Sequence, residues 1–191
     1  MRSEIAKGIP LRSRNLAKRG FRVNTLSEMA SRGVVVRVAR GVYVPADGPV
    51  SEHLDYEAAA VAVPSGVFTL RSALRLHGLT DENPRRMTMA IPANRHAPKT
   101  TLPIDFVYAE PERLSMDAET MNPNGVPFRV FCLERTLVEC FRARNKFGIG
   151  VAATALREAF NSGRIDFQVL SRCMRDGRMT RVMAPYVEAL S

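Results

Sequence analysis

Three consecutive residues, Glu134-Arg135-Thr136, combine a carboxylate, a guanidinium and a hydroxyl, which are group types that catalysis uses. They begin a predicted helix, and a carboxylate in the first turn of a helix interacts favourably with the helix dipole. Arg135 can pair with a loop group or a carbonyl in such a position. Charged groups with perturbed ionisation mark functional sites only in some cases, because structural ion pairs are perturbed too. We therefore expect these residues to stabilise the fold.

Histidine and cysteine give no sign of a metal or redox centre. The three histidines are scattered and match no zinc spacing (His53, His77, His96). We expect His77 to cap a helix or lie in the core, because it directly precedes Gly78. The three cysteines are far apart, with no C-x-x-C (Cys132, Cys140, Cys173). They indicate reduced thiols in a cytoplasm.

Motifs of the common enzyme classes are missing. A nuclease needs clustered acids with a lysine, and Asp105 stands alone on a predicted strand. A nucleotidyltransferase needs a Gly-Ser turn followed by paired carboxylates, and Ser65-Gly66 has no such pair after it. No Walker loop and no G-x-S-x-G motif occurs. The sequence therefore predicts no enzyme activity, no catalytic residue, no metal site and no cofactor.

Positive charge is concentrated near the N-terminus. The chain has 191 residues, a net charge of +9 and a pI of about 10.2. Residues 1–50 hold ten Lys/Arg and three Asp/Glu, a net charge of +7, whereas the remainder holds 18 basic and 16 acidic residues. A uniformly basic surface would not show this asymmetry. The distribution favours a polyanionic partner for the first quarter of the chain.

The segment 11–45 has the pattern helix, tight turn, helix, hairpin. Residues 12–19 favour a helix that Gly20 ends. A second helix ends at Gly33, and we expect one buried stripe on it (Val23, Leu26, Met29, Ala30). The β-branched residues that follow are split by Ala39-Arg40-Gly41, which suits a hairpin turn. This is the outline of a winged helix-turn-helix. Its usual first helix would have to come from the single turn at 3–7.

Such a module predicts a specific set of DNA contacts. Short polar residues on the second helix would face bases (Asn24, Thr25, Ser27, Glu28). Basic residues would hold phosphates or enter the minor groove (Arg12, Arg14, Lys18, Arg22, Arg32, Arg37, Arg40).

The rest of the chain predicts a second domain. Turn-forming residues at 46–51 place the boundary, giving a DNA-binding domain over 1–47 and an α+β domain over 48–191. We expect Ser51, Thr69 and Asp166 to cap helices. Strands are predicted at 87–92, 104–109 and 126–132, a loop with at most one helical turn at 111–124, and helices from 133 onward with buried stripes that include Phe160 and Phe167. The fold class is therefore α+β, with a small sheet and several helices.

Four stretches in this order resemble one family: RVARGVYVP, LRSALRLHGL, GVPFRVFCLERTLVECFRAR and GVAATALREAF. They are similar to the AbiEi-type antitoxins, transcriptional regulators of bacterial type IV toxin–antitoxin and abortive-infection systems. The resemblance covers roughly residues 9–190, and RGVYV and LERTL are its most specific pieces. It implies a repressor whose winged helix binds operator repeats in double-stranded DNA. It also implies a C-terminal domain that counteracts a nucleotidyltransferase-like toxin, generally without a stable complex.

Other functions stay open on the sequence alone. The protein could be a stand-alone regulator without a toxin partner, or a protein-interaction module whose basic N-terminus is incidental. An enzyme acting on RNA or nucleotides, with the basic segment as a substrate clamp, is a third hypothesis. No apolar run reaches transmembrane length, and the N-terminus lacks a signal-peptide core. We therefore expect a cytoplasmic protein with no membrane partner.

Overall fold

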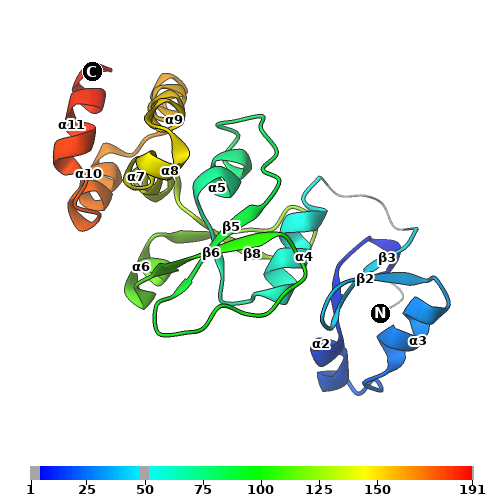
Figure 1. The fold of residues 1–191 in the computed structure, drawn as a ribbon. Helices are drawn as coiled ribbons and strands as arrows, with labels where there is room; N and C mark the ends of the chain where they lie inside the picture. Colours follow the sequence, from blue (N-terminus) through cyan, green and yellow to red (C-terminus); the bar gives the residue numbers. More distant parts are fainter. Residues whose placement is uncertain (1–4, 48–51, 191) are drawn as a thin grey trace.

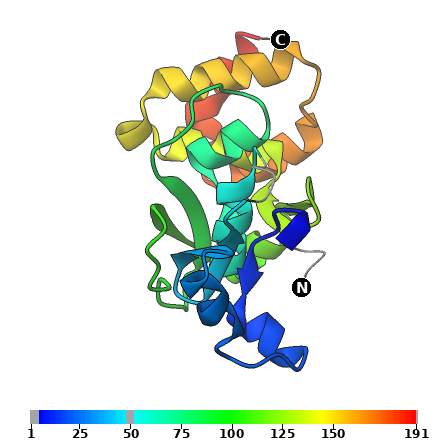
Figure 2. The same cartoon turned by 90° about the vertical axis from the view of Figure 1, so that its right-hand side faces the viewer.

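A computed structural model describes residues 5–47 and 52–190 of the chain (Figure 1). The fold is α+β, as predicted, with a three-stranded and a five-stranded sheet. The N-terminal elements lie at one end of the molecule in both views, and the C-terminal helices lie at the other (Figures 1 and 2). No helix in the described ranges is both long and apolar enough to cross a membrane.

The N-terminal part contains two short helices and a three-stranded antiparallel sheet. Its elements are β1 (Leu11–Arg12), α2 (Ser13–Lys18), α3 (Thr25–Ser31), β2 (Val35–Ala39) and β3 (Val42–Pro45). The strand order is β1-β3-β2. The predicted hairpin is present, and its turn needs Gly41, which adopts a φ of +73°. The two-residue strand β1 was not predicted, and it includes Arg12, which we expected in the first helix.

A small hydrophobic cluster holds this part together. Its buried members come one each from five elements (Leu11, Leu16, Leu26, Val35, Tyr43), and Ile5 packs against them. The predicted stripe on α3 is wrong at Val23, which is 70% exposed because the helix begins only at Thr25. The predicted first helix at 3–7 lies partly outside the described residues.

The second part is built on a mixed sheet of order β6-β5-β4-β8-β7. The strands are β4 (Val67–Phe68), β5 (Met87–Pro92), β6 (Ile104–Ala109), β7 (Ala118–Met121) and β8 (Phe128–Phe131). Strands β5 and β6 match their predicted bounds, and β8 lies within the predicted range. The loop expected at 111–124 allowed for one helical turn, which the structure extends to helix α6, but it is wrong at strand β7, which was not predicted.

Eight helices are described in this part. They are α4 (Leu54–Ala62), α5 (Leu70–Leu76), α6 (Pro111–Met116), α7 (Leu133–Arg142), α8 (Arg144–Phe147), α9 (Ile149–Asn161), α10 (Phe167–Asp176) and α11 (Thr180–Glu188). Helix α4 lies between the sheet and the N-terminal elements and contacts β1 and β3 (Figure 1). Helix α7 contacts α5, α9, α10 and α11, so it is the centre of the C-terminal helices.

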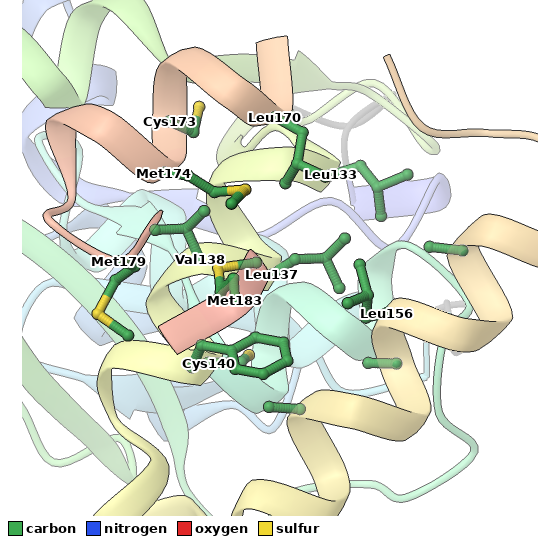
Figure 3. Close-up of a cluster of buried hydrophobic side chains, with 14 of the residues drawn as sticks. Leu133, Leu137, Val138, Cys140, Leu156, Leu170, Cys173, Met174, Met179 and Met183 are labelled. Carbon is green, nitrogen blue, oxygen red and sulfur yellow. The ribbon is translucent and has the colours of Figure 1, made fainter. Parts of the chain in front are cut away.

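Each face of the five-stranded sheet has its own hydrophobic cluster. On one face, Met87, Met89 and Ile91 pack with α4 and α5. On the other, Ala90 and Phe131 pack with Leu114 of α6. A third cluster fills the space among α7, α9, α10 and α11 (Figure 3). Burying these side chains is the main force that holds the fold together.

Of the predicted helix caps and buried stripes, some are confirmed and others are wrong. Asp166 caps α10 by accepting hydrogen bonds from the backbone N–H groups of Gln168 and Val169. Thr69 occupies the capping position of α5, but its hydroxyl makes no capping bond. Phe167 was expected in the core and is 51% exposed, since it lies at the first position of α10. The Ser51 cap falls outside the described residues.

Candidate nucleic-acid interface

Helix α3 presents a polar face to solvent. Leu26 is buried against the N-terminal cluster, with Met29 and Ala30 half-buried beside it. Three of the four residues predicted to face bases are exposed (Asn24, Ser27, Glu28). Thr25 is half-buried, and its hydroxyl donates a hydrogen bond to the Arg22 carbonyl at 2.8 Å. The helix can thus offer amide, hydroxyl and carboxylate groups to a partner.

The predicted cations are also largely exposed. Arg12, on β1, is half-buried. The other six are exposed (Arg14, Lys18, Arg22, Arg32, Arg37, Arg40). Residues 5–47 contain nine Lys/Arg and two acids, Glu28 and Asp47. Little negative charge is therefore present to neutralise these cations, which is the electrostatic condition for holding a phosphate backbone.

The hairpin turn and the start of α2 are joined directly. The backbone N–H of Ser13 donates to the carbonyl of Gly41 at 2.9 Å. Ser13 lies between Arg12 and Arg14, and Gly41 follows Arg40, so the backbone segments that carry three predicted phosphate-binding residues lie side by side at this point. The hydrogen bond joins the turn to the start of α2 and so keeps these two segments together.

Arg37 and Arg32 lie in different surroundings. The ladder between β2 and β3 is irregular between Arg37 and Ala39, and Arg37 Nε donates to the Ala39 carbonyl at 3.4 Å. Arg32 lies at the opposite end of the hairpin, where it lines a small cavity with Pro45 and Asp47. The structure therefore does not bring Arg32 to the segments that carry Arg12, Arg14 and Arg40.

A basic loop from the second part adds to this surface. The hydroxyl of Thr101 donates to the carbonyl of Val38 on β2 at 3.0 Å. The same loop, residues 93–103, carries exposed Arg95 and Lys99. Its charge is visible in the sequence, but its position beside the hairpin is not, because 63 residues separate the two bonded groups.

Glu134 and Arg135 belong to a buried structural network. Arg135 is fully buried, and its Nε and its second terminal nitrogen both lie 2.7 Å from Oδ2 of Asp117. Arg172 binds the other oxygen of Asp117 at 2.7 Å, which raises the pKa of Arg172. Glu134 accepts from the backbone N–H of Asp166 at 2.9 Å. These contacts tie α7 to the junction of α6 and β7, where Asp117 lies, and to the start of α10.

His77 is a buried core histidine. Its Nε2 lies 2.8 Å from the carbonyl oxygen of Phe131 and therefore donates to it. Burial disfavours the charged imidazolium and lowers the pKa of His77. The bond joins the end of α5 to strand β8 instead of capping α5.

The three cysteines are free thiols. Cys140 is fully buried, and burial raises its pKa. The interaction between the neighbouring Cys132 and Cys173 thiols raises the pKa of Cys132 and lowers that of Cys173. Within residues 5–47 and 52–190, no three His, Cys, Asp or Glu side chains gather closely enough to hold a metal ion.

The fold and the charge distribution together describe an α+β protein with a basic N-terminal part. No protein-family profile matches the chain, and no curated protein matches it. Among solved structures, the chain is similar to the RV2827C protein from Mycobacterium tuberculosis, with a TM-score of 0.62 and 15% sequence identity. The match covers 91% of this chain and 69% of that one. It shows a shared fold that extends over both parts of the molecule.

Proposed function

We propose that the chain is a sequence-specific DNA-binding repressor whose N-terminal elements form a winged helix. The observation that carries the proposal is the backbone bond from Ser13 to Gly41, which places the segments that carry Arg12, Arg14 and Arg40 side by side, on the part of the chain that also exposes the polar face of α3. In this arrangement α3 enters the major groove, and the hairpin is the wing beside the phosphate backbone.

The connectivity supports this assignment. A short strand precedes two helices, and it pairs with the second strand of the hairpin that follows them. The helices are joined by the short turn at 19–24, as in a helix-turn-helix. The single turn at Ile5 and Ala6 would correspond to the end of the usual first helix, and Ile5 packs against the same cluster.

The role of the second part rests on the family resemblance. In an AbiEi-type protein, residues 48–191 would counteract a nucleotidyltransferase-like toxin. In this structure the segment RGVYV occupies the hairpin turn and β3, and LERTL occupies the first turns of α7, where every residue is buried. LERTL is thus part of the framework of the fold, so the toxin-directed surface of the chain would lie elsewhere.

The test is a gel-shift titration of the full chain with its own upstream DNA and with a random duplex, at several salt concentrations. Arg40→Ala should weaken binding to both duplexes and lower the salt slope by about one unit, because one phosphate contact is lost. Asn24→Ala should mainly reduce the preference for upstream DNA. Arg181→Ala, an exposed arginine on α11, is the matched control and should change neither.

Three outcomes would count against the proposal. Equal, weak binding to both duplexes would leave only a basic surface and favour a protein-interaction module. An unchanged salt slope in Arg40→Ala would remove the wing from the interface. An equal loss on both duplexes in Asn24→Ala would show that α3 does not face the bases.

A further inference from the structure

Two adjoining cavities lie beside the five-stranded sheet, away from the basic N-terminal part. Their volumes are about 440 Å³ and 270 Å³. Four residues line both cavities and so join them (Tyr108, Ala109, Arg113, Arg142). The larger volume falls within the range of about 300 to 1,000 Å³ that is typical of small-molecule sites.

The floor of the larger cavity is apolar. It is lined by Ala90 of β5, Val107 of β6 and Phe131 of β8, which belong to the sheet face that packs on α6. Tyr108, a residue that is 59% exposed, also lines the cavity. A floor of this kind favours a ligand with an apolar body, because binding removes apolar surface from water.

The opposite wall is cationic. Arg113, Arg142 and Lys146 line the larger cavity, and Glu139 is the one acid among the described residues that does so. Oε1 of Glu139 lies 4.0 Å from Arg113 and 3.8 Å from both Arg142 and Arg135, and it makes no hydrogen bond within the described chain. One carboxylate is thus shared among three guanidinium groups.

Arg135 is already paired with Asp117 and lines neither cavity, so the larger cavity itself has three cations against Glu139. The smaller cavity adds Arg178 but also two acids, Glu110 and Asp176. The excess of positive charge therefore lies in the larger cavity, where it favours an anionic group on the ligand.

Two further features set the cavities apart. Thr69 lines the larger one and is 1% exposed, and its hydroxyl has no hydrogen-bond partner among the described residues. A buried hydroxyl left unpaired costs free energy, and a ligand acceptor would satisfy it.

The backbone beside the cavities is also unusual. The non-glycine residues described with positive φ are Leu70 (+51°) and Arg178 (+56°), and each lines one cavity. Strained backbone of this kind concentrates at functional sites.

From these observations we propose that the joined cavities bind a small organic anion with an apolar body of aromatic size. The body lies on the floor formed by Ala90, Val107 and Phe131. The anionic group lies between Arg113 and Arg142, the two cations common to both cavities. This site is separate from the proposed DNA interface, and its existence does not depend on DNA binding.

The experiment uses the full chain and two fluorescent probes, anilinonaphthalene sulfonate and its uncharged counterpart N-phenylnaphthylamine. We expect saturable binding of one sulfonate per chain, with shifts in the amide resonances of Ala90 and Val107. Arg142→Gln should weaken binding of the sulfonate about tenfold, because a charge-assisted hydrogen bond is lost. The same variant should leave the affinity for the uncharged probe within about twofold. Arg142 is 52% exposed at its side chain, so the variant should fold.

A third cavity provides the matched control. It has a volume of about 540 Å³ and is lined mainly by apolar residues of α9 and α11, together with Arg157. A sulfonate probe that simply seeks apolar surface would bind there, and Arg157→Gln would weaken it. The proposal is overturned if the sulfonate does not bind saturably, if Arg142→Gln leaves its affinity unchanged, or if Arg157→Gln causes the loss instead.

Discussion

Asp117 and Arg135 are residue types found in catalytic sites, but here they form a buried ion pair within the fold. Both side chains are almost fully buried, and Asp117 also binds Arg172. Charges held this way are costly to bury, and their pairing compensates for that cost. Sequence reasoning correctly assigned Arg135 to a structural pair. It could not name Asp117, which lies 18 residues away in a segment predicted to be a loop.

Removing the Asp117 carboxylate should destabilise the fold strongly. Asp117→Asn leaves the Arg135 guanidinium buried without its closest counter-charge. We expect a loss of about 3 to 5 kcal/mol in the free energy of unfolding, measured by urea denaturation. Asp105→Asn is the control, since Asp105 pairs with Arg86 at 2.7 Å on the surface and should cost less than about 1 kcal/mol. Similar losses in the two variants would contradict this account.

The buried imidazole of His77 should make stability depend on pH. Its pKa is lowered in the folded state, so below the ordinary value of 6.5 the unfolded chain binds a proton that the folded chain does not. The free energy of unfolding that depends on neutral His77 is therefore fully present above pH 6.5, and it declines as the pH falls below that value. His77→Gln, which keeps a donor near the Phe131 carbonyl, should show a weaker decline between about pH 7.5 and 5.5 in urea denaturation.

His96→Gln is the matched control for this pH effect. His96 is exposed in the loop of residues 93–103. Its replacement should leave the pH dependence of stability as it is in the unmodified chain. If His77→Gln and His96→Gln give the same profile, burial of His77 is not the cause of the decline.

At the scale of elements, local sequence patterns predicted those strands and turns that are determined by residues close together in the chain. Alternating apolar residues gave β5 and β6, and turn residues gave the hairpin. Strand β7 was missed because its residues are exposed or half-buried without alternation, so pairing with β8 alone defines it. Val23 was wrongly assigned to the buried stripe of α3. It lies just before the helix, but its spacing from Leu26 is the same as that of residues within a helix. The cavity residues were not predicted, since they come from separate strands and helices that only the tertiary fold brings together.

Two glycines at the start of α9 should respond oppositely to the same substitution. Gly148 precedes the helix with a φ of +88°, whereas Gly150 lies within it, and an added Cβ would meet no atom at either position. Gly148→Ala should destabilise the protein by about 1 kcal/mol because of backbone strain. Gly150→Ala should stabilise it by about 0.5 to 1 kcal/mol through helix propensity. Thermal unfolding of both variants would reveal the opposite signs, and a common sign would refute the backbone explanation.

At the scale of the whole molecule, the two parts have separate hydrophobic clusters. The N-terminal cluster draws its members from residues 5–43, and the other three draw theirs from residues 56–190. We therefore expect a fragment of residues 48–191 to unfold cooperatively and to bind anilinonaphthalene sulfonate as the full chain does. The same fragment should have lost binding to duplex DNA. A fragment without a cooperative transition would show that the contacts of α4 with β1 and β3 are essential to the fold.

The parallel pairing of β4 with β8 has a consequence for folding during synthesis. Phe68 pairs with Val130, so the five-stranded sheet cannot close until residue 131 has left the ribosome. The N-terminal sheet needs the chain only as far as Pro45. At about 5 to 20 residues per second, translation separates these two points by roughly 4 to 17 s. For that interval a nascent chain would carry a finished basic module while the rest of the protein was still unformed.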